Sequence, residues 1–193
     1  MNHYPISPSP QATGYMEIDP DTGGLIIPLR SGTYPGRFTL IDPEDYHLVR
    51  DFAWYARRTG RPDARRSIYV HGRRNGSKEY AYMHRLILGI TDPRVKVDHI
   101  NRDPLDNRRA NLRVATQAEN TFNRGPMRNA ASRFKGVTWY PKNQKWVARI
   151  RIDGEQRYLG IYGSEEDAAR AYDAAAFKAF GEFAYLNFPE EVR

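Results

Sequence analysis

The chain contains no cysteine among its 193 residues. Disulfide bonds, cysteine nucleophiles and zinc sites built on cysteine are therefore excluded. Histidine is also scarce, with five copies, and no two have the close helical spacing of a zinc protease. No hydrophobic run is long enough to cross a bilayer, and the N-terminus lacks the apolar core of a signal peptide. We therefore expect a soluble cytoplasmic protein that makes no contact with a membrane.

Positive charge and aromatic side chains are abundant instead. Thirty Lys and Arg residues outnumber 23 Asp and Glu residues, so the net charge is +7 and 12% of residues are aromatic. A basic chain rich in aromatic residues usually binds a polyanion, most often a nucleic acid. The alternative is a solvated basic surface that has no partner. The length suits one ordinary domain or two small ones.

The first half of the chain mixes strand and helix signals. Residues 1–22 are rich in Pro, Ser, Thr and Asp, which predicts a flexible tail. The run GGLIIPLRSG (23–32) predicts a short strand. Apolar residues near helical spacing predict a helix within 43–58. An Asn-Gly pair inside 67–89 predicts a hairpin, followed by a short helix.

The stretch VDHINRDPLDNRRANLRVATQAENTFNR (97–124) is unusual because an acid and an imidazole stand side by side among Asn and Arg residues. Its pattern predicts a strand at VDHI, a polar loop, and a second strand at LRVAT. Thr116 and Glu119 then have the spacing of a capping box, which predicts the start of a helix. This helix carries Asn120 in its first turns and would let it face Asp98 and His99.

The second half of the chain has a different pattern of predicted elements. Residues 123–132 have linker composition, and three strand-like runs follow at 133–140, 145–152 and 156–162. Ser164 begins an alanine-rich helix that extends to about residue 180. Its face of small side chains suits close packing against a sheet. The residues interpreted as core are Trp139, Trp146, Ala148, Ile150, Leu159 and Ile161.

The residue types in 97–124 suit metal-assisted chemistry on phosphate. The carboxylate of Asp98 and the amide oxygen of Asn120 are ligands that Mg²⁺ or Mn²⁺ accepts. Adjacent strand residues point to opposite faces, so His99 would not easily bind the same ion as Asp98. His99 is instead a candidate general base for water. The alternatives are a structural Asp-His pair and an Asn120 that only makes hydrogen bonds at the helix start.

The wider pattern closely resembles the HNH endonucleases, particularly the phage-type homing and free-standing enzymes, over residues 24–124. The motifs that carry the resemblance are MHRL (83–86), VDHIN (97–101), DNR (106–108), NLR (111–113), and Glu119-Asn120 with Asn123.

The HNH resemblance implies a ββα-metal fold and a role for each motif residue. Asp98 and Asn120 would hold one divalent metal, Mg²⁺ or Mn²⁺, and His99 would activate water. Asn111 would brace the loop and orient His99. His84 would either position the site or pack structurally. Three arginines are expected to contact phosphate or to brace the loop: Arg108, Arg109 and Arg113.

Residues 132–189 resemble the AP2/ERF DNA-binding domain through FKGVTWY, KWVARIRIDG, RYLGIYGSEEDAARAYD and LNFP. The resemblance implies a three-stranded antiparallel sheet backed by one helix, with the sheet in the major groove. The implied DNA contacts are Lys135, Gly136, Thr138, Tyr140, Lys142, Lys145, Arg149, Arg151, Gln156, Arg157 and Tyr158. Plant members commonly have Arg at the positions of Thr138, Tyr140 and Gln156, and often an acid at Arg149. The target sequence of the plant proteins is therefore not expected here.

Together the patterns predict an α+β protein that binds double-stranded DNA, in the form of a monomer. The expected segments are a tail (1–22), an HNH domain (23–124), a linker (125–132) and an AP2/ERF domain (133–189). The expected function is metal-dependent DNA cleavage or nicking at a preferred site, of the homing type. If the gene is phage-encoded, the compartment would be the host cytoplasm. The alternative is a DNA-binding regulator whose HNH module has lost cleavage.

Overall fold

The computed structural model describes residues 17–30, 37–59, 67–127 and 130–192. The chain divides into two compact units, Met1–Val114 and Ala115–Arg193. No helix in these described ranges is long and apolar enough to cross a membrane. Most of the predicted tail lies outside the described residues, but residues 17–22 form hydrogen bonds with the segment that follows, in which Ile26 N donates to Glu17 O and Gly23 N to Asp19 O, both at 2.8 Å.

The N-terminal unit begins with a strand pair. Strand β1 (Leu25–Pro28), which the sequence predicted, pairs antiparallel with β2 (Phe38–Ile41). A 3-10 turn, η1 (Pro43–Asp45), and the one-turn helix α1 (Tyr46–Val49) follow.

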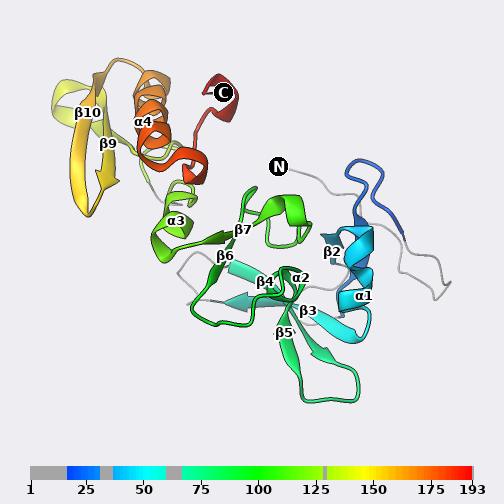
Figure 1. Ribbon diagram of the computed structural model, residues 1–193. Helices are drawn as coiled ribbons and strands as arrows, with labels where there is room; N and C mark the ends of the chain where they lie inside the picture. The colour runs from blue at the N-terminus through cyan, green and yellow to red at the C-terminus, as the bar shows by residue number, and fades with distance from the viewer. Residues whose placement is uncertain (1–16, 31–36, 60–66, 128–129, 193) are drawn as a thin grey trace. The chain divides into compact units, whose positions relative to one another are not determined.

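A three-stranded antiparallel sheet forms the centre of this unit (Figure 1). Its strands are β3 (Phe52–Thr59), β4 (Ser67–Arg74) and β5 (Tyr80–Tyr82). The predicted hairpin joins β4 to β5, and Gly76 in its turn has φ of +70°, which suits glycine. The short helix α2 (Met83–Ile87) comes next, as predicted.

The helix expected over 43–58 is wrong beyond Val49, because Phe52 begins β3. Phe52, Trp54 and Ala56 alternate along the strand and are buried together with Val70 in one core. The strand also packs tightly, since a Cβ on Gly72 would lie 2.6 Å from the Trp54 ring. The burial of every second residue in a strand therefore determined the structure of this segment, although its apolar spacing also fitted a helix.

The stretch 97–124 folds in the predicted order of strand, loop, strand and helix. Strand β6 (Lys96–His99) pairs with β7 (Leu112–Ala115), and the loop between them ends in the 3-10 turn η2 (Arg109–Asn111). Helix α3 (Gln117–Phe122) follows, and both hydrogen bonds of the predicted capping box are present. The arrangement of these elements around a metal stays a prediction.

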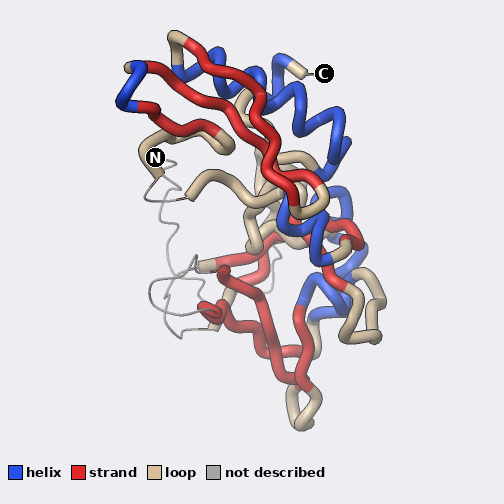
Figure 2. Tube along the Cα trace, turned by 90° about the vertical axis from the view of Figure 1, so that its left-hand side faces the viewer, coloured by secondary structure: helices blue, strands red, loops and turns tan. Residues whose placement is uncertain are grey.

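The C-terminal unit contains the predicted sheet and helix. Strands β8 (Val137–Tyr140), β9 (Lys145–Ile152) and β10 (Glu155–Tyr162) form an antiparallel sheet in the order β10-β9-β8, drawn in red in Figure 2. Helix α4 (Glu165–Phe180) packs against the sheet through Ala168, Ala169 and Ala176, which are buried. Short 3-10 turns lie at Pro141–Asn143 (η3), Gly181–Phe183 (η4) and Pro189–Glu191 (η5).

Two residues expected in the core of this sheet are instead exposed. Trp139 and Ile161 each keep 37% of their surface accessible. The register explains Ile161, because it lies opposite Val147, on the sheet face that also carries Arg149 and Arg151. A shift in register between Tyr158 and Gly160 changes the alternation along β10, so that a simple period of two fails there.

Helix α3 lies in the C-terminal unit by its contacts, and the domain boundary expected at residue 124 stays a prediction. The rings of Phe122 and Phe180 stack with centroids 3.8 Å apart and planes at 11°. Phe122 O also accepts hydrogen bonds from Lys135 Nζ at 2.6 Å and from Tyr185 N at 3.1 Å. The end of α3 is thus held by three separate segments of the unit that follows it.

We predict that Phe180→Ala lowers the free energy of unfolding by about 1–3 kcal/mol, because it removes the stacking partner of Phe122. Phe177→Ala is the matched control, since Phe177 lies on the same helix but is 48% exposed. Chemical denaturation of the full chain measures both. Equal losses in the two variants would show that the stack contributes nothing specific.

Candidate active site and nucleic-acid interface

His99 is held by the side chain of Asn107. The imidazole Nε2 lies 3.3 Å from Asn107 Oδ1. Asn107 Nδ2 donates to Thr39 Oγ1 at 2.8 Å and to Pro104 O at 3.2 Å. Thr39 Oγ1 in turn donates to Leu105 O at 2.6 Å. The loop before β7 and strand β2 therefore both determine how His99 is oriented.

This network also selects the tautomer of His99. Thr39 uses its hydroxyl hydrogen on Leu105, so it can only accept from the Asn107 amide nitrogen. The Asn107 oxygen then faces the imidazole and accepts from Nε2–H. In neutral His99 the basic lone pair is consequently on Nδ1, as a general base requires.

Burial keeps His99 neutral. It lowers the pKa of the imidazole, against a smaller raising effect of the Asn107 hydrogen bond and of nearby carboxylates. His84 on α2 is also buried, and its ring meets the His99 ring edge-on at 5.5 Å. Burial, followed by the charge interaction with His99, lowers the pKa of His84 to about 3. Among the described residues, nothing forms a hydrogen bond with His84 Nδ1. The structure therefore places His84 beside His99, as a neutral ring.

Asp98 is buried and paired with Arg113. Both Nε and Nη2 of the guanidinium donate to Asp98 Oδ2, at 3.0 and 2.8 Å. Arg113 is itself largely shielded from solvent in this pair. The pair compensates a carboxylate that would otherwise be costly to bury. Arg113 therefore has an ion-pair partner within the protein.

The loop is stabilised by further contacts of the predicted residues. Asn111 Oδ1 accepts from Asn101 N at 2.8 Å, and its Nδ2 donates to Asp106 O at 2.7 Å. Asn111 thus braces the loop, while the side chain that contacts the His99 ring nitrogen is that of Asn107.

Arg108 and Arg109 each bind an acid of the same unit. Arg108 donates to both oxygens of Asp106, at 2.8 and 2.7 Å. Arg109 makes a two-pronged contact with the buried carboxylate of Asp45. Of the two interpretations left open for these arginines, the geometry favours loop braces. Contact with phosphate stays a prediction.

The metal ligands were predicted as Asp98 and Asn120. Asn120 lies in the first turns of α3, within the C-terminal unit, and its approach to Asp98 stays a prediction. No cluster of three His, Cys, Asp or Glu side chains that could hold a metal exists within the described ranges. One carboxylate, one amide oxygen, waters and substrate phosphate would still fit a hard divalent cation, which needs few protein ligands.

The predicted DNA contacts of the second module gather on one face of its sheet. Tyr158 lies opposite Arg149, Gln156 opposite Arg151, and Tyr140 opposite Lys145. Paired residues in an antiparallel sheet project to the same side, so these six side chains share the face turned away from α4. All six are exposed, and Thr138 is exposed beside them. Such a basic face with two tyrosines suits contact with phosphates and base edges.

Two of the predicted contacts also have a structural role, and their contact with DNA stays a prediction. Lys135 directs its ammonium to Phe122 O and toward the ring of Tyr185, whose centroid is 5.6 Å away. Gly136 has φ of +79°, and a Cβ there would collide with the Tyr172 ring. Lys142 is exposed in η3, and Arg157 is exposed on β10.

Sequence reasoning missed Asn107 and Thr39 as supports of the site. The motif DNR contains Asn107, but nothing in its spacing shows that the amide is fully buried. Thr39 is separated from Asn107 by 68 positions. The available signal was a polar side chain inside an otherwise apolar strand, FTLI.

Comparison with known proteins supports both resemblances. Residues 81–122 match the family model of the HNH endonucleases, and residues 132–182 match the AP2 domain. The chain therefore carries an HNH endonuclease segment and a C-terminal AP2 domain. No solved structure gives a significant match.

The similar proteins come from a virus and from plants. An uncharacterized HNH endonuclease of Acanthamoeba polyphaga mimivirus is 29% identical over 157 residues, 81% of this chain and 78% of that protein. Dehydration-responsive element-binding protein 2D of Arabidopsis thaliana is 44% identical over 34% of this chain. APETALA2-like protein 2 of Oryza sativa is 45% identical over 34%. The matched regions span only 32% and 15% of these two plant proteins.

We predict that acidification destabilises the N-terminal unit through His84. The unfolded chain protonates this histidine near its ordinary pKa of 6.5, whereas the folded state resists protonation until about pH 3. Between these values the unfolded state binds more protons, so stability falls as the pH falls, by up to about 1.4 kcal/mol per pH unit. His84→Phe should flatten this slope, whereas His47→Gln, at an exposed position, should preserve it. Denaturation curves from pH 4 to 7 measure the slopes, and a parallel slope in His84→Phe would refute the assignment.

Proposed function

We propose that the protein is a metal-dependent DNA endonuclease whose HNH segment hydrolyses a phosphodiester bond while its AP2 domain binds the duplex. The observation that carries the proposal is the buried His99, which Asn107 orients through Nε2. A neutral imidazole with its lone pair on Nδ1 can take a proton from the attacking water.

The divalent cation, Mg²⁺ or Mn²⁺, would be held by Asp98 and Asn120. When bound, it would stabilise charge on the phosphate and on the leaving oxygen. The protein's own residues would orient His99 through Asn107 and keep the loop rigid through Asn111 and Asp106. Burial would exclude bulk water from the base.

The AP2 domain would supply most of the duplex affinity. Linking two binding modules makes the second contact intramolecular, so two modest contacts can select one site. One active site per chain favours nicking over double-strand cleavage. In this way the protein would select a preferred site, of the kind that homing-type enzymes cut.

One observation favours the alternative of a DNA-binding regulator without cleavage. Arg113 already neutralises Asp98, and a cation at the same carboxylate would compete with the guanidinium. Footprinting without strand breaks, in the presence of Mg²⁺ or Mn²⁺, would support this alternative.

We predict that His99→Ala reduces metal-dependent nicking of plasmid DNA by about 10²- to 10⁴-fold, because the general base is lost. Asn107→Ala should reduce nicking as well, and should shift the pH profile because the tautomer is no longer selected. His47→Ala is the control for removal of a histidine at an exposed position. Nicking that is equal in wild type and His99→Ala, or absent from both, would contradict the proposal.

We predict that replacing Arg149 and Arg151 together by Ala weakens duplex binding by tenfold or more. The loss of two phosphate contacts should also reduce the slope of log affinity against log salt by about 2. The control is the pair Arg133→Ala and Arg170→Ala, which removes the same charge from arginines that bind Glu166 and Glu191. Fluorescence anisotropy of labelled duplex DNA at several salt concentrations measures both. An equal loss of duplex affinity in the control would show that the effect comes from net charge and not from these two positions.

A further inference from the structure

One face of the β3-β4-β5 sheet is lined with aromatic rings that the proposed function does not use. Tyr55 lies opposite His71, and His71 lies opposite Tyr82 on the other side. Arg73 lies opposite Tyr80 in the same register. Because side chains alternate along a strand, these residues and Tyr69 share one face. We call the rings of Tyr55, Tyr69, His71, Tyr80 and Tyr82 the aromatic platform.

The aromatic platform is not the core of the unit. The core uses the opposite face of the sheet, where Trp54 and Val70 are buried. Tyr80, in contrast, keeps 48% of its surface accessible. Tyr55, Tyr69, His71 and Tyr82 are partly buried. The five rings therefore lie outside the buried core and stay partly accessible to solvent.

Ring contacts connect the aromatic platform to the candidate base. The centroids of Tyr55 and His71 are 6.0 Å apart, and those of His71 and Tyr80 are 5.2 Å apart. Tyr80 meets Tyr82 at 5.5 Å, and Tyr82 meets His84 at 5.8 Å. His84 then meets His99 at 5.5 Å. The row of rings thus leads across the sheet to the residue proposed to activate water.

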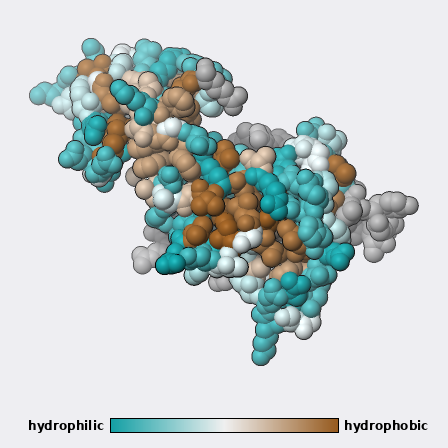
Figure 3. All heavy atoms as spheres, viewed as in Figure 1, coloured by the Kyte–Doolittle hydropathy of each residue, from teal (hydrophilic) through white to brown (hydrophobic). Residues whose placement is uncertain are grey.

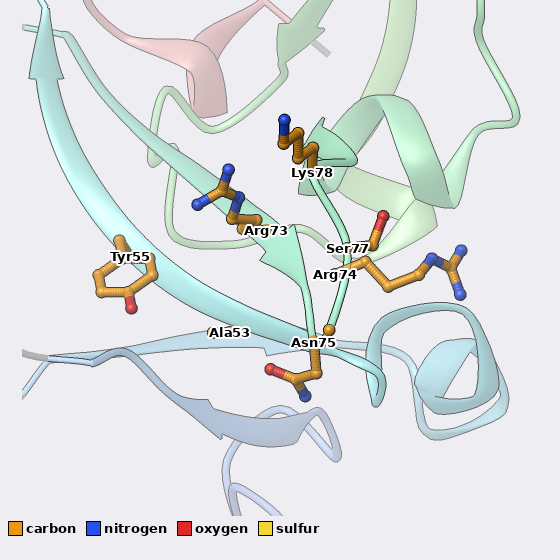
Figure 4. A pocket seen from close by; sticks show the side chains of 8 residues that line it. Ala53, Tyr55, Arg73, Arg74, Asn75, Ser77 and Lys78 are labelled. Atoms are coloured by element: carbon orange, nitrogen blue, oxygen red, sulfur yellow. The ribbon is translucent and has the colours of Figure 1, made fainter.

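Two cations border the aromatic platform. Arg73 and Lys78 are exposed, and neither forms an ion pair within the described part of the chain. They line an open hollow together with Tyr55 and Asn75, and Figure 4 shows their charged ends extending to the same side of the hairpin. Arg74 extends away from them and is occupied by Glu79 and the Phe52 ring. The hairpin that carries these residues is hydrophilic in Figure 3.

We propose that the aromatic platform binds unstacked bases of a single DNA strand, while Arg73 and Lys78 contact the phosphates of that strand. Base–aromatic stacking tolerates any sequence, because every base has a π face, and flanking cations follow the backbone. Paired bases in an intact duplex have their faces covered by neighbours, so a row of rings suits a melted or single-stranded segment. Placing this segment beside the cleaved phosphate rests on the proposed function, whereas binding of the strand does not.

The direct test is the affinity of the full chain for a labelled single-stranded oligonucleotide, measured by fluorescence anisotropy without added metal. Tyr80→Ala should weaken this affinity by about five- to 150-fold, the range for losing one stacked base, while Tyr80→Phe should keep it. Duplex affinity should be the same in wild type and Tyr80→Ala. An unchanged single-strand affinity in Tyr80→Ala, or an equal loss on duplex, would overturn the proposal.

The cations have their own matched control. Arg73→Ala with Lys78→Ala should lower the salt slope of single-strand binding by about 1.4, since each single-strand phosphate contact contributes about 0.7. Lys96→Ala, at an exposed position of β6, should leave affinity and slope as in wild type. If Lys96→Ala alone lowers the salt slope by about 0.7, half the effect of the double variant, the effect comes from net charge and the site is refuted.

Stacking itself can be observed with 2-aminopurine in the oligonucleotide. Its fluorescence should be quenched on binding to wild type and Tyr80→Phe but not to Tyr80→Ala, and the absence of this difference would overturn the proposal. These readouts need no cleavage, so they separate the two hypotheses. Weaker single-strand binding by Tyr80→Ala than by Tyr80→Phe would support the aromatic platform even if the wild type never nicks DNA.

Discussion

The buried amide of Asn107 is the interaction on which the candidate active site depends. It is fully inaccessible to solvent and joins the His99 ring, the hydroxyl of Thr39 and the loop carbonyl of Pro104. Since a buried polar group without partners is costly, each of these contacts restricts the others. The orientation of His99, its tautomer and the path of the loop therefore depend on one shared set of hydrogen bonds.

The protein uses its arginines in two different ways. Near the candidate site, Arg108, Arg109 and Arg113 bind carboxylates of their own unit and stabilise the loop. On the AP2 sheet, Arg149 and Arg151 are exposed beside tyrosines. The net charge of +7 is thus a poor guide to where a polyanion binds. The first group forms ion pairs with acids, whereas Arg149 and Arg151 form none within the described part of the chain, and this difference depends on the fold.

Helix α3 carries the end of the HNH motif but is held by residues of the C-terminal unit. The HNH segment extends to residue 122, yet the stacked rings of Phe122 and Phe180 hold the end of α3 in the C-terminal unit. Asn120 lies on this helix. The AP2 domain therefore stabilises a helix of the nuclease motif in addition to presenting a basic sheet.

The sequence by itself determined the local elements and the residue types of the site. The capping box at Thr116, the hairpin turn at Gly76 and the three AP2 strands follow from short-range rules that act over a few residues. Only the tertiary structure decided that Phe52 begins a strand, that Asn107 orients His99, and that the rings around Tyr80 share one face. These outcomes depend on contacts between distant positions and on which face of a sheet is buried, and neither is encoded in the spacing of a motif.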